Sequence, residues 1–281
     1  MNKESLKKEI VHKIKQQMLR ENKAYYCPRK PDYSLEIAKT QHDKITKKII
    51  EHCKQNKFEK ILDIGCGFGD LVFSLAKYGK QVYGIDVNEE FIKICDLKKD
   101  FLKQKNIEFI NAPAEKIPFK NNNFDLVVSK TVLEHVEDVE KSISEMVRVT
   151  RKNGLIYIEC PNYIWIKEGH FNVFMLPLMP KWLFRIWLRL LGKNPDFLSH
   201  IKYVTPSRII NSLKKRNVVC RNISEELISE ILDGKSEAIK HTHKRIYDII
   251  KTTRLLGLNK ALLFLSKSFQ AYPVTIIMGK K

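Results

Sequence analysis

The stretch from Lys60 to Asp70, KILDIGCGFGD, constrains the fold more than any other part of the chain. Its apolar run predicts a buried strand, and the pattern that begins at Asp70 predicts a helix over 70–78, with Gly79 as its stop signal. Between them lie three glycines spaced two residues apart, Gly65, Gly67 and Gly69. A strand that enters a helix through glycines makes a turn without side chains, where backbone N–H groups can face a ligand. The same residues would also suit a tight turn that binds nothing.

The spacing of these glycines argues against two common nucleotide-binding motifs. A dinucleotide fingerprint requires Gly-x-Gly-x-x-Gly, and Asp70 stands where its last glycine belongs, which disfavours an NAD-dependent dehydrogenase. A P-loop requires Lys followed by Ser or Thr, and neither follows Gly69.

A second predicted strand, from Gln81 to Asp86, ends in an acidic residue 21 positions after Gly65. A carboxylate there can accept two hydrogen bonds from the vicinal hydroxyls of a ribose. It could instead cap the helix that begins at Asn88. The sequence leaves both roles open.

Three further segments continue an alternation of strands and helices. Strand 107–111 leads into the loop 112–119, APAEKIPF, and the apolar strand 124–129 leads into Leu133-Glu134-His135-Val136. A Lys-Asn-Gly turn then precedes strand 155–160. Such alternation predicts a parallel, doubly wound α/β sheet that binds its ligand at the carboxyl ends of the strands.

Residues 60–160 resemble the core of class I S-adenosyl-L-methionine (SAM)-dependent methyltransferases, and most of all the small-molecule methyltransferases of ubiquinone and menaquinone biosynthesis. The resemblance implies a mostly parallel, seven-stranded, Rossmann-like sheet with its last strand antiparallel, plus helical cap insertions. We expect residues 218–223 and 272–278 to supply the last two strands. The implied cofactor is SAM, and the product is S-adenosyl-L-homocysteine.

The resemblance also implies cofactor contacts. The loop 112–119 matches the family's adenine-contacting loop except at Pro113, where the family usually has an aspartate. The backbone near Ala114, or the side chain of Glu115 or Asn111, could replace that contact. The expected cofactor-binding residues are Asp63, Gly65, Cys66, Gly67, Gly69, Asp86, Val87, Ala114, Glu115, Lys130 and Tyr26, with Tyr25 and Tyr33 as further candidates from the same N-terminal segment.

Methyl transfer from SAM needs a bound donor, an aimed acceptor and the exclusion of water, so few catalytic side chains are expected. If the acceptor is a hydroxyl, a nearby base helps, and His135 is the best-placed candidate, although a structural histidine would look the same. His170, His200 and Tyr203 are secondary candidates. An amine acceptor would need no base. No His/Cys/Glu cluster has metal-ligand spacing, so no metal site is expected.

The net charge of +19 is uneven: residues 1–60 carry +8, residues 61–160 carry −2 and residues 161–281 carry +13. Basic flanks favour anionic partners such as phosphorylated small molecules, nucleotide sugars, anionic lipid or nucleic acid, although lysines that only solvate the surface would give the same balance.

No signal peptide is visible, and the six cysteines form no Cys-x-x-Cys pair. Both features suit a cytoplasmic protein.

The chain divides into four predicted segments. Residues 1–57 form an N-terminal helical lid, 58–160 the SAM-binding core, 161–204 a substrate cap, and 205–281 the completion of the sheet. The last segment has a helical insertion at about 224–268, which could form a dimer interface or extend the cap.

The cap contains a helical pattern with Lys181, Arg185 and Arg189 on one basic stripe and apolar residues around the rest. This helix could hold an anionic lipid surface or a lipid-linked substrate, or it could simply cover the active site.

The sequence therefore predicts a methyltransferase that acts on an oxygen, slightly favoured over a nitrogen, of a small anionic or carrier-linked metabolite such as a glycan precursor. Two alternatives remain, an RNA methyltransferase that uses the basic flanks and a catalytically silent SAM-binding module. Ser129-Lys-Thr-Val stands where nucleic-acid amino methyltransferases have an Asn-Pro-Pro-Tyr-type motif, which makes base methylation less favoured.

Overall fold

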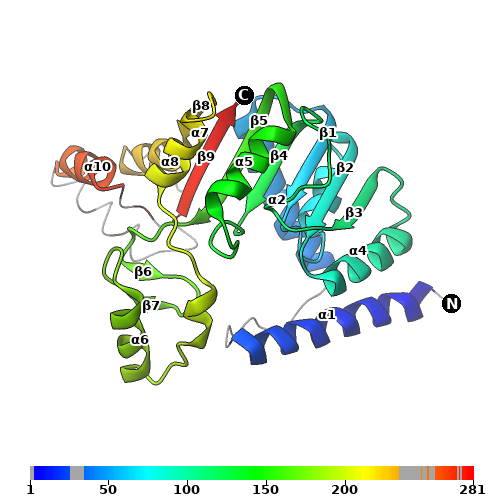
Figure 1. The fold of residues 1–281 in the computed structure, drawn as a ribbon, viewed down its shortest axis with the longest axis horizontal. Helices are drawn as coiled ribbons and strands as arrows, with labels where there is room; N and C mark the ends of the chain where they lie inside the picture. The colour runs from blue at the N-terminus through cyan, green and yellow to red at the C-terminus, as the bar shows by residue number, and fades with distance from the viewer. Residues whose placement is uncertain are drawn as a thin grey trace.

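The computed structural model is organised around one seven-stranded sheet and describes residues 3–25, 35–233, 248, 252, 257–270, 272 and 274–281 (Figure 1). The strand order is β3-β2-β1-β4-β5-β9-β8; β1 to β5 are parallel, and β9 runs antiparallel to both of its neighbours. This confirms the predicted fold. The strands are β1 Phe58–Ile64, β2 Gly79–Asp86, β3 Ile107–Asn111, β4 Phe124–Lys130, β5 Thr150–Pro161, β8 Val219–Asn222 and β9 Val274–Lys280.

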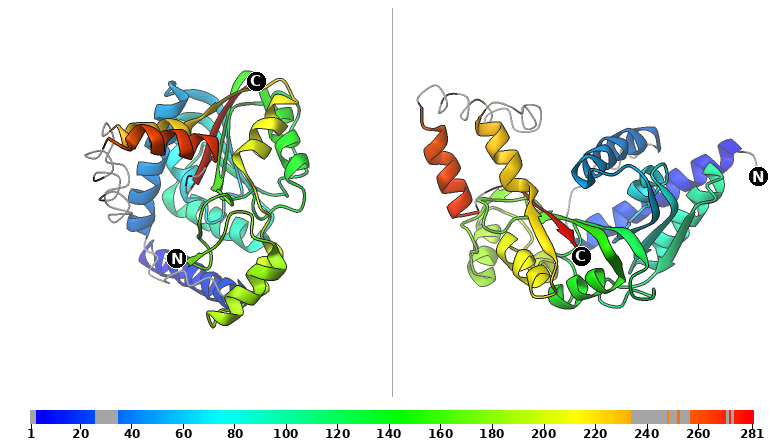
Figure 2. Two further views of the ribbon diagram at one scale, coloured as in Figure 1. Left: turned by 90° about the vertical axis from the view of Figure 1, so that its left-hand side faces the viewer. Right: turned by 90° about the horizontal axis from the view of Figure 1, so that it is seen from above.

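Helices cover both faces of the sheet because the central strands are apolar on both sides. In β4, Val127 packs into the core on one face, while Leu126 and Val128 pack into the core on the other. Figure 2 shows α5 and α7 on one side and α2 and α8 on the opposite side. The helices of these layers are α2 Leu35–Cys53, α3 Asp70–Leu75, α4 Glu89–Leu102, α5 Val139–Val149, α7 Pro206–Lys214 and α8 Ile223–Leu232.

The N-terminal helix α1, Lys3–Tyr25, lies outside these layers. Ile10 and Ile14 are fully buried against Ile94 of α4. From there α1 runs past the carboxyl ends of the strands toward the segment that precedes α7 (Figure 1). Tyr26 and Tyr33 lie outside the described residues, so their expected cofactor contacts stay predictions.

The segment between β5 and α7 has a small hydrophobic core of its own, which includes Tyr163, Phe171, Phe184 and Leu198. It contains a two-stranded hairpin that the sequence did not predict, and the predicted cap helix is present as α6. Its elements are β6 Lys167–Glu168, β7 Val173–Phe174, α6 Lys181–Leu190 and the 3-10 helix η1 Asp196–His200.

The expected helical insertion at 224–268 begins as α8 and ends as α10, Asn259–Ser268, while residues 234–247 between them lie outside the described residues. No described helix is long and apolar enough to cross a bilayer.

One boundary differs from the prediction. The helix expected to reach residue 78 ends at Leu75, and Gly79 is the first residue of β2 rather than a helix stop signal. Gly79 pairs with Phe58 in the sheet. A Cβ at Gly79 would lie 2.7 Å from the side chain of Val82, so close packing at the strand start accounts for this glycine.

Candidate active site

The candidate site lies at the carboxyl edge of the sheet, where β1 has β2 on one side and β4 on the other. The chain leaves β1 toward β2 and returns on the other side at β4, so the loops after these strands diverge and leave a crevice. The glycine loop follows β1, Asp86 ends β2 and Lys130 ends β4. The topology therefore brings the three sequence motifs to one edge.

All three glycines of the loop have left-handed backbone conformations, with φ of 67° at Gly65, 52° at Gly67 and 74° at Gly69. A Cβ at Gly65 would lie 2.4 Å from Val132, and one at Gly69 would lie 2.8 Å from Phe109. A Cβ at Gly67 would have no atom within 4 Å. Close packing therefore accounts for the outer two glycines, and Gly67 borders open space.

The loop amides differ from the expectation that they face a ligand. The N–H of Cys66 donates to the carbonyl of Ile85, and the N–H of Gly69 donates to the carbonyl of Cys66. The N–H of Gly67 donates to Oδ2 of Asp86 at 2.9 Å. These three amides hold the shape of the loop. The expectation is wrong for them because the end of β2 accepts the hydrogen bonds of Cys66 and Gly67, and the loop's own carbonyl at Cys66 accepts that of Gly69.

Two carboxylates converge beneath this loop. Asp86 is 9% exposed and Asp63 is 2% exposed. Burial raises the pKa of Asp86. Burial, together with the charge of Asp86, raises the pKa of Asp63 well above its usual value. Two neighbouring carboxylates that are largely buried favour a cationic ligand, because a cation would stabilise the ionised form of each.

The alternative role for Asp86 as the helix cap is wrong. Asn88 caps α4, and its side chain accepts from the N–H of Glu90. Oδ1 of Asp86 instead accepts from the N–H of Asn88, so this carboxylate links the glycine loop to the residue that caps α4. Next to it, Val87 is 73% exposed, an apolar side chain at the rim.

The loop after β3 is held by its own side chains. Asn111 donates to the carbonyls of Asp86 and Val87, and Ala114 is buried in the core. Oε1 of Glu115 accepts from the N–H groups of Glu137 and Asp138 at 2.7 and 3.2 Å. The Glu115 carboxylate thus ties this loop to the start of α5.

Lys130 is also engaged within the protein. Its Nζ lies 3.0 Å from Oε1 of Glu159, and the hydroxyl of Tyr157 donates to the other oxygen of that carboxylate. Lys130 thereby places a positive charge near Asp63, where it lowers the pKa that burial and Asp86 raise.

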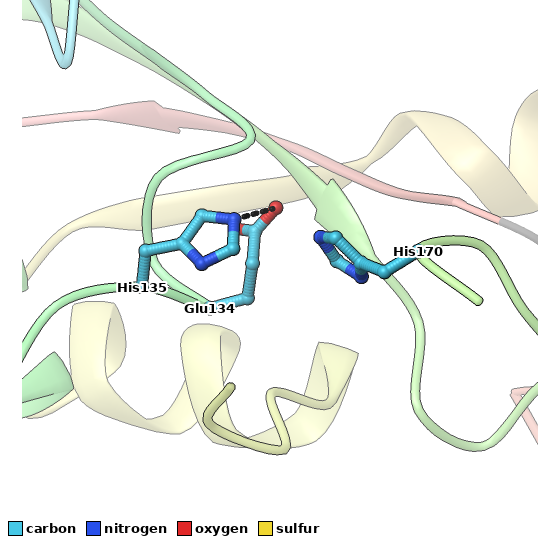
Figure 3. Close-up of side chains that lie close together, drawn as sticks. All are labelled: Glu134, His135 and His170. Carbon is cyan, nitrogen blue, oxygen red and sulfur yellow. Dashed lines mark ion pairs between the residues drawn. The ribbon is translucent and has the colours of Figure 1, made fainter. Parts of the chain in front are cut away.

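A second group of polar side chains follows β4, on the side of the cap. Glu134, His135 and His170 have side-chain donor atoms within 4.8 Å of one another, and the Glu134 carboxylate lies between the two rings (Figure 3). Glu134 is fully buried, and neither of its oxygens has a hydrogen-bond partner in the described part of the chain. Burial raises the pKa of Glu134 to about 7.

The other two predicted catalytic residues lie around this group. The ring of Phe197 is 5.8 Å from that of His135 and 6.3 Å from that of His200, which is exposed at the end of η1. Tyr203 stacks on Tyr163 at 4.8 Å, and burial raises the pKa of Tyr203 to about 12. Stacking and burial therefore account for the position of Tyr203.

Sequence reasoning missed Glu134 and Glu168 as site residues, together with Lys98. Glu134 had a weak signal, an acidic residue in the loop that follows an apolar strand. Lys98 had none, since it lies on α4 and reaches Asp70 and the carbonyl of Phe68 only after folding.

Comparison with known proteins finds a family match over the strands and loops that form this site. Residues 62–158 match a family model described as a methyltransferase domain. The chain is 30% identical over 197 residues to the ubiquinone biosynthesis O-methyltransferase of Pelagibacter ubique, covering 69% of this chain and 75% of that protein. It is 28% identical to the demethylmenaquinone methyltransferase of Lactobacillus johnsonii over 63% of this chain and 76% of that protein.

Among solved structures, the YcgJ protein of Bacillus subtilis superposes with a TM-score of 0.54 at 18% identity, over 86% of this chain and 98% of that one. This likeness shows the fold.

Proposed function

Because the chain belongs to the class I SAM-dependent methyltransferases, we propose that it methylates an oxygen of a small, anionic, lipid-linked acceptor. SAM is the cofactor, and it supplies a sulfonium methyl group whose C–S bond breaks as the acceptor oxygen forms the new C–O bond. The observation that carries the proposal is the arrangement at one sheet edge: two buried carboxylates on one side of β4 and a polar cluster beside the cap on the other.

The residues of the glycine-loop edge fit the donor. SAM has an ammonium and a sulfonium cation, and Asp63 and Asp86 are carboxylates whose pKa values are raised by burial, which for Asp63 acts together with the charge of Asp86. A cation beside them would favour their ionised forms. Gly67 leaves room for close approach. In this proposal Asp63 and Asp86 hold the charged and sugar portions of SAM, and Val87 and Ala114 border its base.

Oxygen as the acceptor atom is supported on two grounds. The relative that is 30% identical is named an O-methyltransferase. The cluster of Glu134, His135 and His170 also offers oxygen and nitrogen lone pairs that can bind or deprotonate a hydroxyl. The role of His135 at the acceptor follows from this placement and stays a prediction.

An amphiphilic acceptor is supported by the surface of the cap. Trp182, Ile186 and Leu190 on α6 are 66%, 46% and 74% exposed, and they lie four residues apart on one face. Arg185 and Arg189 accompany them on the same helix. An exposed apolar stripe beside arginines suits the boundary between anionic headgroups and acyl chains.

The test is a methyl-transfer assay with isotopically labelled SAM and a panel of phenolic acceptors, with and without a lipid tail, in anionic vesicles. We expect label on an acceptor oxygen, located by mass spectrometry and NMR, and a higher kcat/KM for the tailed acceptors. Label on nitrogen, or on RNA in a parallel assay, would overturn the proposal. SAM binding without transfer to any acceptor in the panel would support the silent module instead.

A further inference from the structure

The geometry points to a divalent transition-metal site formed by Glu134, His135 and His170, at the junction of the core and the cap (Figure 3). Two imidazoles and one carboxylate are a donor set that suits Zn²⁺, Mn²⁺ or Fe²⁺. The sequence did not predict this site, because His170 comes from a different connection of the sheet than Glu134 and His135.

The first argument is the state of Glu134. Its side chain is fully buried, and both oxygens lack a hydrogen-bond partner in the described part of the chain. Nε2 of His135 is at ion-pair distance from Oε1, 3.9 Å, which is too long for a hydrogen bond. Buried carboxylates are ordinarily paired, hydrogen-bonded or bound to a metal, since an isolated charge in the interior is costly. A cation between the two rings would satisfy this carboxylate without any change of fold.

The second argument is the orientation of His170. Its Nδ1 lies 2.7 Å from Oε1 of Glu168, and Oε2 of Glu168 accepts from the N–H of Phe171. A carboxylate oxygen accepts, so Nδ1 carries the proton and the lone pair of Nε2 is left for another partner. Metal-binding histidines characteristically make this second contact, which fixes their tautomer and raises their basicity. Glu168 is 2% exposed, so the surrounding protein packs against the carboxylate that orients His170.

The distances are compatible with coordination. Nε2 of His135 lies 3.9 Å from Oε1 of Glu134. The three donor atoms all lie within 4.8 Å of one another. Donor atoms at about 2.0–2.2 Å from one metal lie roughly 3.0–3.5 Å from each other, so the side chains must rotate toward each other when the ion binds. Three protein ligands leave at least one coordination position open, as in catalytic metal sites.

The open position gives the ion a role that rests on the proposed function. A hydroxyl bound to a divalent ion loses its proton more readily, so the ion would activate an acceptor oxygen. The binding site itself is independent of the acceptor, and it can be tested without one.

The experiment uses the full chain without an affinity tag, freed of metal by chelator, and titrates it with Co²⁺ while d–d absorption is recorded. Equilibrium dialysis with Zn²⁺ gives the stoichiometry. We expect one ion per chain, at least tenfold weaker binding in Glu134→Gln and in His170→Ala, and about tenfold weaker binding in Glu168→Gln. His12→Ala is the matched control, because His12 is exposed on α1 and far from the cluster in sequence.

Each variant is also titrated with SAM, and its melting temperature is measured, so that a folding defect is recognised. Wild-type protein that binds SAM but no Co²⁺ or Zn²⁺ would overturn the site. So would metal binding that survives in Glu134→Gln and His170→Ala, or that is lost in His12→Ala. Failure of the acceptor assay with intact metal binding would count against the proposed function alone.

Discussion

The backbone amide of Gly67 donates a 2.9 Å hydrogen bond to Oδ2 of Asp86, so the glycine loop and the end of β2 are joined directly. The other oxygen of Asp86 accepts from Asn88 at the start of α4. Asp86 therefore has two tasks: it orders the loop, and in the proposed function it faces the donor. Variants at this position test both tasks together.

Replacing Asp86 with Ala should weaken SAM binding at least tenfold in isothermal titration, because the loop loses its anchor and the crevice loses a charge. Asp86→Asn keeps one acceptor oxygen and should retain more stability than Asp86→Ala. Unchanged SAM affinity in Asp86→Ala would remove Asp86 from the cofactor site.

Gly67 and Gly69 should respond differently to alanine. Both have left-handed backbones, where a Cβ costs about 1–2 kcal/mol. At Gly69 the Cβ would also meet Phe109 at 2.8 Å and Cys95 at 3.0 Å. We expect Gly67→Ala to fold and to lose SAM affinity, and Gly69→Ala to lose more stability in urea titration. A Gly67→Ala protein that binds SAM as wild type would show that the open space beside this residue is not the cofactor's.

Asp63 should make stability depend on pH. Its pKa in the folded protein is raised, so the folded state binds the proton more tightly than the unfolded state. The stability present below the unfolded pKa of about 3.9 is therefore lost as the pH rises through the folded pKa. Asp63→Asn removes this loss, so we expect the variant to exceed wild type in unfolding free energy by an amount that grows from pH 4 to pH 8.

Urea titrations across this range measure the difference, and most other titrating groups cancel between the two proteins. A difference that shrinks with rising pH would contradict the raised pKa of Asp63. The same variant should bind SAM more weakly, since the cofactor's cations lose a partner.

Lys98 should stabilise the junction of the glycine loop and α3. Its Nζ is buried and donates to Asp70 and to the carbonyl of Phe68 at 2.5 and 2.6 Å. Lys98→Met leaves Asp70 without this partner and should lower the unfolding free energy by about 3–5 kcal/mol. The double variant Lys98→Met/Asp70→Asn should recover part of the loss. Urea titration of the four proteins gives the coupling, and strictly additive losses would argue against the pair.

The exposed face of α6 should bind anionic vesicles. Trp182→Ser and Leu190→Ser remove exposed side chains, so they should leave the melting temperature unchanged and weaken sedimentation with anionic vesicles several-fold. Each of Arg185→Gln and Arg189→Gln should cost about 1 kcal/mol of vesicle binding. Phe264→Ser on α10 is the matched control, because Phe264 is 70% exposed and lies outside the cap. Equal losses in the control would mean that binding is nonspecific.

Much of the fold could be predicted from the sequence because its determinants are local. Apolar strands, glycine turns and helical periodicity depend on neighbouring residues, and the rules for parallel sheets then order β1 to β5. The hairpin β6–β7 was missed because each of its strands has only two residues, too few for a pattern.

The candidate site also has features that the sequence could predict and features that it could not. Gly65, Gly67, Gly69 and Asp86 could be placed at one edge from sequence, since strand ends meet there in any doubly wound sheet. The hydrogen-bond partners of the loop amides could not be predicted from sequence, because they depend on how closely β2 approaches the loop.

By itself, then, the sequence determined the alternating layers, the side-chain-free turn after β1 and the acidic end of β2, all of which follow from short-range pattern. Only the tertiary structure decided that His170 reaches Glu134 from another connection and that Lys98 holds Asp70. Those contacts join residues distant in the chain, and they arise from packing of whole elements that no local pattern records.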